Sequence, residues 1–367
     1  MLILGIETSC DETAAAVVRD GREILSNVVV SQIDIFAEYG GVIPEVAARS
    51  HLEAMMPVVN KALTDASCTW DEIDAIAVTH APGLLGSLLI GTLTARTLAI
   101  LHHKPLYAVH HLKSHVYANW LSGTQEDPSF PLLALVVSGG HTQILYMRGH
   151  NQFEIIGTTH DDAVGECFDK VAKILGLPYP GGPSIAKAAL SGDATRYRLP
   201  HPKVEGLDFS FSGLKTAVLR AVQKEVGVPI SYPSHKLAGL LTEQQVCDFA
   251  ASFQKTAVEI LHEKLEMALS EHPEVKSVVL AGGVSANEEL RKQMLEMVPS
   301  GHTQGRSAEP MVPSGTFSSI HAYFPLPSLS GDNGAMVAAA CYYEILSGVK
   351  PTNPYALNIY PRVAIES

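Results

Sequence analysis

Two histidines four residues apart are the side chains in this sequence whose spacing points most directly to chemistry. His111 and His115 follow an apolar run at residues 106–109. If a helix begins near His111, both imidazoles lie on one face, as two ligands of one divalent metal must. The same spacing also fits a pair of helix-start histidines that only form hydrogen bonds. A metal site would need a third ligand from elsewhere, preferably an oxygen donor.

Asp332 is the carboxylate that could complete such a set. It precedes a helix of small residues expected at 335–346. An aspartate in this place is more often the N-cap of the helix than a metal ligand. Because spacing does not show whether Asp332 meets the histidines, both interpretations stay open.

Three glycine-containing turns follow apolar runs, at residues 138–142, 180–183 and 282–287. Such turns present backbone N–H groups and let phosphate oxygens approach closely. Each alone is weak evidence, since glycine turns also merely reverse the chain, and none matches a Walker A or dinucleotide-binding motif. Three of them in one repeated α/β frame favour nucleotide binding.

Three further carboxylates are candidates for the same chemistry. Asp11 and Glu12 lie in the first polar turn, where they could polarise water, a metal or an amine, or act as ordinary capping residues. Asp169 could accept hydrogen bonds from a ligand hydroxyl, or pair with Lys173 one helical turn later. The sequence leaves both alternatives open for each carboxylate.

The elements that must position these residues occur twice along the chain. The first series has strand patterns at residues 2–7, 14–19 and 24–30, a helix at 44–63, a strand at 73–78 and a small-residue helix at 86–101. The second has strands at 132–137, 144–147 and 153–157, a helix at 161–175, a strand at 275–280 and a helix at 287–297. The repeated order predicts an internal duplication. Two such α/β units that face each other leave a cleft on which the polar turns converge.

Two other segments are assigned no chemistry. An apolar stripe at residues 241–269 indicates a helix that faces the core. Residues 299–327 are rich in Ser, Pro, Gly and His with little periodicity, which predicts a surface loop or insertion.

Length and charge limit the class of protein. A chain of 367 residues suits two domains. The net charge of −12 argues against a protein that coats nucleic acid by itself, although residues 187–224 carry a local excess of about four positive charges that could meet an anionic partner or be a chance cluster on the surface.

Cysteine usage and hydropathy indicate the compartment. Five scattered cysteines argue against a disulfide framework. We expect no signal peptide and no transmembrane run, because the apolar amino terminus meets Glu7 at once and the run at 84–101 is interrupted by polar residues. The expected location is the cytoplasm.

The assembled motifs are similar to those of one known family. They are GIETSCDET at residues 5–13, YGGVIPE at 39–45, APGL at 81–84, VSGGHT at 137–142, YPGGP at 179–183, FSFSGLKT at 209–216 and AGGVSAN at 281–287. From residue 4 to about 361 the chain resembles the bacterial-type TsaD family of tRNA N6-adenosine threonylcarbamoyltransferases, within the actin-like, sugar-kinase and Hsp70-like superfold.

The resemblance implies a fold and a domain division. The fold class is α/β, with duplicated ribonuclease H-like units forming two actin-like domains and a ligand cleft between them. The expected first domain comprises residues 1–112 plus about 333–367, and the second comprises about 113–332, including the loop or insertion near 299–327.

The resemblance also implies an activity and its substrates. The enzyme would transfer the threonylcarbamoyl group of threonylcarbamoyl-AMP to N6 of adenosine 37, beside the anticodon, in tRNAs that read codons beginning with adenine. Expected partners are tRNA, a TsaB-like paralogue and a TsaE-like ATPase, with tRNA contact at residues 187–224 and on partner surfaces.

The resemblance assigns roles to particular residues. His111, His115 and Asp332 would hold one divalent metal ion, Fe(II) in preference to Zn(II). The adenylate site would comprise Val136, Val137, Ser138, Gly139, Gly140, Asp169, Gly182 and Asn287. The donor is an activated mixed anhydride, so the site must orient it and stabilise charge rather than supply a strong nucleophile. We hypothesise that Asp11 or Glu12 assists deprotonation of the adenine amine.

The sequence departs from the family pattern at three places. Lys113 stands between the histidines where the family usually has an acidic residue, and a basic side chain beside a metal is expected to weaken or re-tune the site. The stretch at 299–322 is longer than usual. Ser330 and Gly331 replace a Cys–Thr pair before Asp332, which bears on the geometry of the third ligand.

Three other functions compete with this interpretation. A metallopeptidase would need the HExxH glutamate, and Lys113 cannot act as that general base. A kinase or an ATP-dependent chaperone is compatible with the superfold, because fold does not settle function. A scaffold without catalysis is the third alternative.

Overall fold

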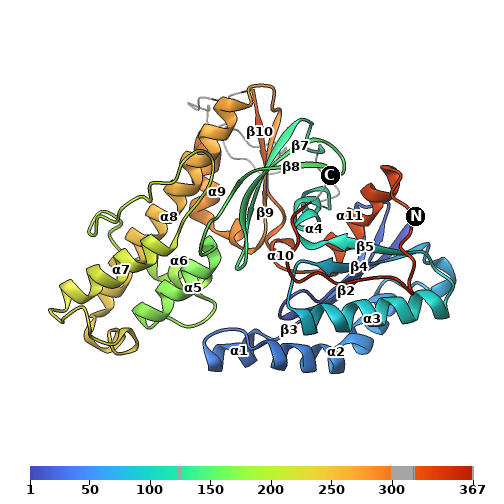
Figure 1. Ribbon diagram of the computed structural model, residues 1–367, viewed down its shortest axis with the longest axis horizontal. Coiled ribbons are helices and arrows are strands. Elements are labelled where there is room, and N and C mark those ends of the chain that lie inside the picture. Colours follow the sequence, from blue (N-terminus) through green and yellow to red (C-terminus); the bar gives the residue numbers. More distant parts are fainter. Residues whose placement is uncertain (122–125, 299–316, 318, 366–367) are drawn as a thin grey trace.

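The computed structural model describes residues 1–121, 126–298, 317 and 319–365. These residues form two five-stranded sheets, each with its own helices (Figure 1). Within the described ranges, no helix combines the length and apolar character needed to cross a bilayer. All five cysteines are free thiols.

The first sheet has the strand order β3-β2-β1-β4-β5. Its strands are β1 (Leu2–Glu7), β2 (Glu12–Arg19), β3 (Glu23–Ser31), β4 (Ala75–Ala81) and β5 (Leu106–His110). Strands β1, β2 and β3 are antiparallel, while β4 lies parallel to β1 and β5 parallel to β4. Its helices are α1 (Ile33–Tyr39), α2 (Pro44–Asp65) and α3 (Leu85–Leu101), with a 3-10 turn η1 (Trp70–Glu72).

The second sheet has the order β10-β9-β6-β7-β8. Its strands are β6 (Leu132–Val137), β7 (Thr142–Gly149), β8 (Gln152–Thr158), β9 (Ser277–Ala281) and β10 (His321–Tyr323). Its helices are α5 (Val164–Leu175), α6 (Gly181–Ala189), α7 (Ser212–Glu225), α8 (Glu243–Glu271) and α9 (Glu288–Met297), with 3-10 turns η3 (Ser234–Lys236), η4 (Ala238–Leu240) and η5 (Gly283–Ala286).

The predicted internal duplication is confirmed by these pairings. In the second sheet β6, β7 and β8 are antiparallel, and β9 and β10 extend the sheet in parallel from β6. This is the arrangement of β1 to β5, with the strands in the same order. The central strands β1, β4, β6 and β9 are buried on both faces, which is why they read as continuous apolar runs.

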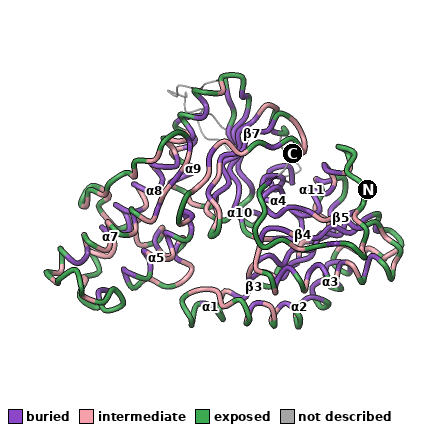
Figure 2. Tube along the Cα trace, in the orientation of Figure 1, coloured by how far each residue is buried: buried purple, intermediate pink, exposed green. Residues whose placement is uncertain are grey.

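A shared core joins the two sheets. Helix α4 (His111–Tyr117) and the 3-10 turn η2 (Ala118–Trp120) follow β5, and α10 (Pro327–Ser330) and α11 (Gly334–Leu346) follow β10. One cluster of buried residues includes Ile3 and Ala77 of the first sheet, Leu132 and Val279 of the second, and Val337 of α11. The central strands of both sheets and helices α4 and α11 are buried, whereas the outer faces of α1 to α3 are exposed (Figure 2).

The structure differs from the sequence-based expectations in four elements. Residues 180–183, expected to form a turn, include the first residues of α6. Helices α1 and α7 were not predicted, although α7 buries Leu214, Val218 and Val222 at i,i+4 spacing. Strand β10 lies within the segment expected to be a loop at 299–327, because pairing with β9 outweighs its weak pattern. Residues 299–316 and 318 of that segment lie outside the described residues. The domain boundaries near 112 and 332 stay a prediction.

Candidate metal centre and its surroundings

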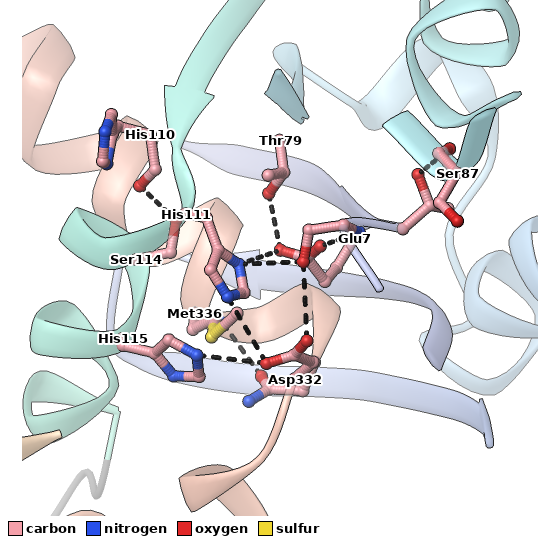
Figure 3. A network of polar contacts seen from close by, with 12 residues as sticks. Glu7, Thr79, Ser87, His110, His111, Ser114, His115, Asp332 and Met336 are labelled. Carbon is pink, nitrogen blue, oxygen red and sulfur yellow. Dashed lines mark hydrogen bonds and ion pairs between the residues drawn. The ribbon is translucent and has the colours of Figure 1, made fainter. Parts of the chain in front are cut away.

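The structure brings His111, His115 and Asp332 together from distant parts of the chain (Figure 3). One ligand atom from each lies within 4.8 Å of the others. Asp332 Oδ1 lies 3.0 Å from His115 Nε2 and 3.6 Å from His111 Nε2. Two atoms bound to one metal at about 2.1 Å, with tetrahedral or octahedral angles, are about 3.0–3.4 Å apart. The cluster therefore has the dimensions of a metal site.

Helix α4 positions the two imidazoles. The helix begins at His111, directly after β5, so the expected helix start is confirmed. The i,i+4 spacing puts both rings on one face, with their centroids 4.6 Å apart and their planes at 76°. The Nε2 atoms of both rings face Asp332, so each ring can direct one lone pair toward the same metal ion.

Close packing of α11 against the first sheet positions the carboxylate. A Cβ at Gly5 would lie 2.2 Å from Gly334 O, and one at Gly334 would lie 2.6 Å from Ala16 N, so only glycine permits this approach. The N-cap of α11 is Asn333, whose side chain accepts a hydrogen bond from Met336 N. The alternative that Asp332 caps this helix is therefore wrong, and its carboxylate faces the histidines instead.

The hydrogen-bonding state of His115 tests whether a metal fits. The ring is 1% exposed, Nδ1 has no hydrogen-bond partner among the described residues, and the 3.0 Å contact of Nε2 with Asp332 lacks hydrogen-bond geometry. A buried imidazole in this state is costly unless another group uses a ring lone pair. Two imidazoles and a carboxylate form a donor set that suits Fe(II) or Zn(II). The residues present fit such an ion.

Glu7, which the sequence analysis did not select, contacts the ring nitrogen of His111 that does not face Asp332. Its fully buried carboxylate accepts hydrogen bonds from Ser9 N at 2.5 Å and Thr79 Oγ1 at 2.6 Å, and lies 3.1 Å from His111 Nδ1. A carboxylate that accepts the Nδ1 proton leaves Nε2 free as a ligand and fixes the ring orientation. The sequence feature that could have identified Glu7 is an acidic residue at the end of a buried apolar strand.

The charges of this cluster shift several pKa values. Burial opposes the charge of His111, but the carboxylates of Asp332 and Glu7 outweigh it and raise the pKa to about 9. Burial likewise opposes ionisation of Asp332, yet His111 and His115 hold its pKa below the usual value. In the absence of a metal, the site is therefore a buried ion pair.

His141 belongs to the same electrostatic surroundings and was noted only as part of a glycine turn. Burial, together with the charges of His111 and His115, lowers its pKa to about 4. Its imidazole is neutral at physiological pH. It can accept or donate one hydrogen bond beside the cluster without adding charge.

The turn with Asp11 and Glu12 lies next to this cluster. Burial is the main cause that raises both pKa values, followed for Glu12 by the charges of Asp332 and Asp11, which bring its pKa to about 9. Ser31 Oγ donates to Glu12 Oε1 at 3.1 Å. A carboxylate with a raised pKa is a stronger base than a solvated one.

His51 of α2 holds that turn in place. Its Nδ1 lies 2.8 Å from Thr13 Oγ1 and its Nε2 lies 2.9 Å from Cys10 O. The side chain is completely buried. Both ring nitrogens of His51 therefore have partners, and these partners, Cys10 and Thr13, flank Asp11 and Glu12 in the sequence.

Loops of the second unit meet at the carboxyl ends of β6 and β9. A Cβ at Gly282, whose φ is +85°, would lie 2.4 Å from Val137 O. A Cβ at Gly139 or Gly140 would meet nothing within 4 Å. These two glycines therefore present accessible main chain, whereas the side chains of Val136 and Val137 are fully buried in β6. Ser138 closes the turn through hydrogen bonds with His141.

The other residues expected at the adenylate site have structural contacts. Asp169 Oδ1 accepts a hydrogen bond from Gly181 N at 2.7 Å, which is the contact that the structure shows in place of the alternative pairing with Lys173. Asn287 accepts from Leu290 N as the N-cap of α9 and donates to Gln254. A Cβ at Gly182 would meet open space. Their contacts with a ligand stay a prediction.

The Lys113 ammonium group contacts residues other than the candidate metal ligands, and its expected effect on the site stays a prediction. Its Nζ donates to Asn151 Oδ1 at 3.1 Å and lies 5.2 Å from the centroid of the Phe153 ring. Two residues after His111, it projects from a different face of α4. Its positive charge acts on buried Glu344 of α11, whose pKa burial raises to about 7 against that attraction.

Comparisons with known proteins show the family to which this chain belongs. The family described as "TsaD: tRNA N6-adenosine threonylcarbamoyltransferase" matches residues 23–339. A protein of that name from Symbiobacterium thermophilum is 50% identical over 350 residues, covering 95% of this chain and 93% of the relative. One from Thermomicrobium roseum is 46% identical over 362 residues, with the same coverage. A component of (R)-2-hydroxyglutaryl-CoA dehydratase from Acidaminococcus fermentans has a TM-score of 0.48 at 14% identity, covering 95% of this chain and 99% of its own.

Proposed function

Because the chain belongs to the TsaD family of tRNA N6-adenosine threonylcarbamoyltransferases, we propose that its donor is threonylcarbamoyl-AMP and its acceptor the adenosine beside the anticodon. The observation that carries this proposal is the buried cluster of His111, His115 and Asp332 beside the accessible glycine turn at 138–142. One part of the site can orient the carbamoyl group, and the other can hold the phosphate and adenosine.

We propose that the three-residue cluster holds a single divalent metal, iron in preference to zinc. The buried nitrogens of His115 and the second-layer carboxylate of Glu7 support this assignment. A bound metal would supply Lewis acidity toward the donor. Since the donor is already an activated anhydride, the protein's proposed part there is to orient the donor rather than attack it.

Backbone N–H groups of the second unit are proposed to bind the adenylate. Gly139 and Gly140 can lie against phosphate oxygens because no side chain covers them. Asp169, Gly182 and Asn287 are proposed to line the nucleoside portion, with Asp169 acting through Oδ2, which Gly181 does not use, and Asn287 through its second Nδ2 hydrogen, which Gln254 does not use. The backbone N–H groups of Gly139 and Gly140 would stabilise the charge that develops on the departing phosphate.

Asp11 or Glu12 is proposed to accept the proton released by the adenine amine. Both are held by His51 beside the cluster, and burial raises their pKa values. The adenine N6 amine is weakly basic and must lose a proton as the new bond to the carbamoyl carbon forms. The ionised form of either carboxylate can accept this proton, and its raised pKa makes that form a stronger base.

A transfer assay tests the whole proposal. Purified protein, metal and partners would be incubated with tRNA, threonine, bicarbonate, ATP and the donor-forming synthase, and the tRNA would then be digested to nucleosides. We expect threonylcarbamoyl adenosine, and we expect Asp11→Asn or Glu12→Gln to reduce its formation while the metal is retained. Absence of the product with metal bound and partners active would contradict the proposal.

The partner is proposed to be a TsaB-like paralogue that docks on α2 and α3, with a TsaE-like ATPase in the same assembly. These two helices pack together and expose apolar side chains at i,i+4 spacing. The set comprises Leu52 and Met56 of α2 and Leu85, Leu89 and Leu93 of α3. Leu52 is 68% exposed and Leu85 60% exposed. Such an apolar two-helix face fits a matching helix pair on another protein.

Size-exclusion chromatography with the purified paralogue tests this docking face. We expect co-elution, which Leu89→Asp should abolish while the thermal unfolding temperature of the isolated chain stays unchanged. Leu190→Asp is the matched control, because Leu190 is exposed at the end of α6. Co-elution of the Leu89 variant would place the interface elsewhere. Contact of tRNA with residues 187–224 and a cytoplasmic location remain parts of the proposal.

A further inference from the structure

Residues 350–365, which follow α11, cross from the first unit to the second. Thr352 N donates to Leu106 O of β5, Tyr360 N to His80 O of β4, and Gly83 N to Pro361 O. The trace passes along the first sheet and ends beside β7 and β8 (Figure 1). The segment thus runs past the carboxyl ends of β4 and β5, where α4 and its histidines begin.

The exposed side chains of this segment differ from those of the protein as a whole. Residues 350–365 contain Lys350 and Arg362 and no acidic residue, although the net charge of the chain is −12. Tyr355 is 74% exposed and Tyr360 45% exposed. Exposed aromatic rings beside cations are the means by which proteins bind single-stranded nucleic acid, through base stacking and phosphate contact.

A cavity of about 400 Å³ lies beside the end of the segment, and its lining includes Leu112, the neighbour in sequence of the candidate ligand His111. Its walls include Arg362 and Val363 of the segment, Leu112 of α4 and His141 of the glycine turn. Leu112 directly follows His111, and Val363 O lies 3.4 Å from His110 Nε2. The volume is in the range of small-ligand sites. The cavity approaches the centre from the side of the 350–365 segment.

We propose that residues 350–365 bind the unpaired nucleotides of the anticodon loop, with Tyr360 stacking on a base, Arg362 contacting a phosphate and the cavity receiving the nucleotide that presents its amine. This inference rests on the proposed function and names the surface that recognises its RNA substrate. Tyr360 is held edge-on against His80, with ring centroids 5.8 Å apart, so its exposed side is fixed next to the end of β4.

Binding of an anticodon stem-loop RNA to the metal-loaded full chain tests the proposal. Fluorescence anisotropy at several salt concentrations should show that Tyr360→Ala weakens binding about tenfold and that Tyr360→Phe restores it, since stacking needs only the ring. Arg362→Ala should weaken binding about fivefold and reduce the slope of log affinity against log salt by about one. The KM for the donor should stay unchanged, because the donor loops belong to the second unit.

Arg19→Ala provides a matched control, because Arg19 is an exposed arginine at the end of β2, beside the amino end of β1 and outside both residues 187–224 and the 350–365 segment. We expect it to bind the stem-loop within twofold of the unchanged protein. Equal binding by the Tyr360→Ala and Arg362→Ala variants would overturn the inference, as would a loss confined to Arg19→Ala. Failure of the unchanged protein to modify tRNA despite normal stem-loop binding would instead contradict the proposed function.

Discussion

The two sheets have the same strand order, yet the ends of their strands carry different chemistry. In the first unit β5 is followed by His111, and the turn after β1 contains Asp11 and Glu12. In the second unit the turn after β6 contains Gly139 and Gly140. Side chains therefore do the binding on one side, while accessible backbone does it on the other.

This difference shows how a duplicated fold supports a reaction between unlike substrates. Equivalent turns sit at equivalent strand ends, so each unit could diverge without altering its sheet. Charged and imidazole groups suit a metal and a proton transfer, whereas bare N–H groups suit a phosphate. Substitutions in one unit at a time test whether the two units have these separate roles.

The largest effect is expected from removing a ligand in the first unit. His115→Ala should eliminate stoichiometric metal and lower kcat/KM at least about 1000-fold, which is about 4 kcal/mol of transition-state stabilisation. Metal content by mass spectrometry and transfer of threonylcarbamoyl to tRNA would be measured. His235→Ala, at an exposed position, should retain both. A fully active His115 variant without metal would refute the ligand assignment.

The second largest effect is expected at Glu7. Glu7→Gln removes the charge that orients His111 and should weaken metal affinity about 10–100-fold. Thr79→Val removes only one hydrogen bond to the same carboxylate and should have a smaller effect. Competition with a chromogenic chelator would rank the two variants. The reverse ranking would mean that Glu7 acts through local folding and not through the histidine.

Two glycines of the second unit should separate binding from folding. Gly140→Val adds a side chain in open space and should raise the donor KM about tenfold with an unchanged unfolding temperature. Gly282→Ala places a Cβ 2.4 Å from Val137 O at a left-handed φ, and should cost about 1–3 kcal/mol of stability. Steady-state kinetics and urea denaturation measure the two effects. A destabilised Gly140 variant with normal KM would contradict this division.

A separate effect, on stability and not on activity, concerns Glu344, at the junction of the units. Its pKa of about 7 in the folded protein exceeds the ordinary 4.5, so the folded state holds the proton more tightly. The contribution of this proton to the free energy of unfolding is fully present below pH 4.5. It is on the order of 3 kcal/mol and is lost as the pH rises to 7. Glu344→Gln should remove this fall and be more stable than the unchanged protein at pH 8.

Urea denaturation of metal-free protein at pH 5 and pH 8 would measure that difference. The comparison between variant and parent isolates Glu344 from other titrating groups. Parallel pH dependence of the two proteins would show that Glu344 does not titrate in this range. Such a result would also mean that Lys113 keeps the carboxylate ionised.

Much of the fold was predictable because its signals are local. Apolar runs and periodic helices along the sequence predicted the duplication, and the i,i+4 spacing predicted the shared face of His111 and His115. Contacts between distant residues were not predictable. The orientation of Lys113 depends on Asn151 and Phe153, and the role of Glu7 depends on the end of β5.

The weaker elements failed for a related reason. Strand β10 forms because β9 is beside it, and α6 begins at glycines that pack on α5, so neither is recorded in its own residues. Asp332 was ambiguous for the same reason: only the fold shows that Asn333 takes the capping role. Tertiary contact decides such positions.

The core shared by the two sheets has a consequence for how the protein unfolds. Side chains of β1 and β4 lie in one continuous cluster with those of β6 and β9, and α4 and α11 complete it. Neither repeat can bury that surface alone, so the two are expected to melt in a single cooperative calorimetric transition. The two repeats are therefore expected to unfold as one thermodynamic unit, so that a destabilising substitution in either repeat lowers the stability of both.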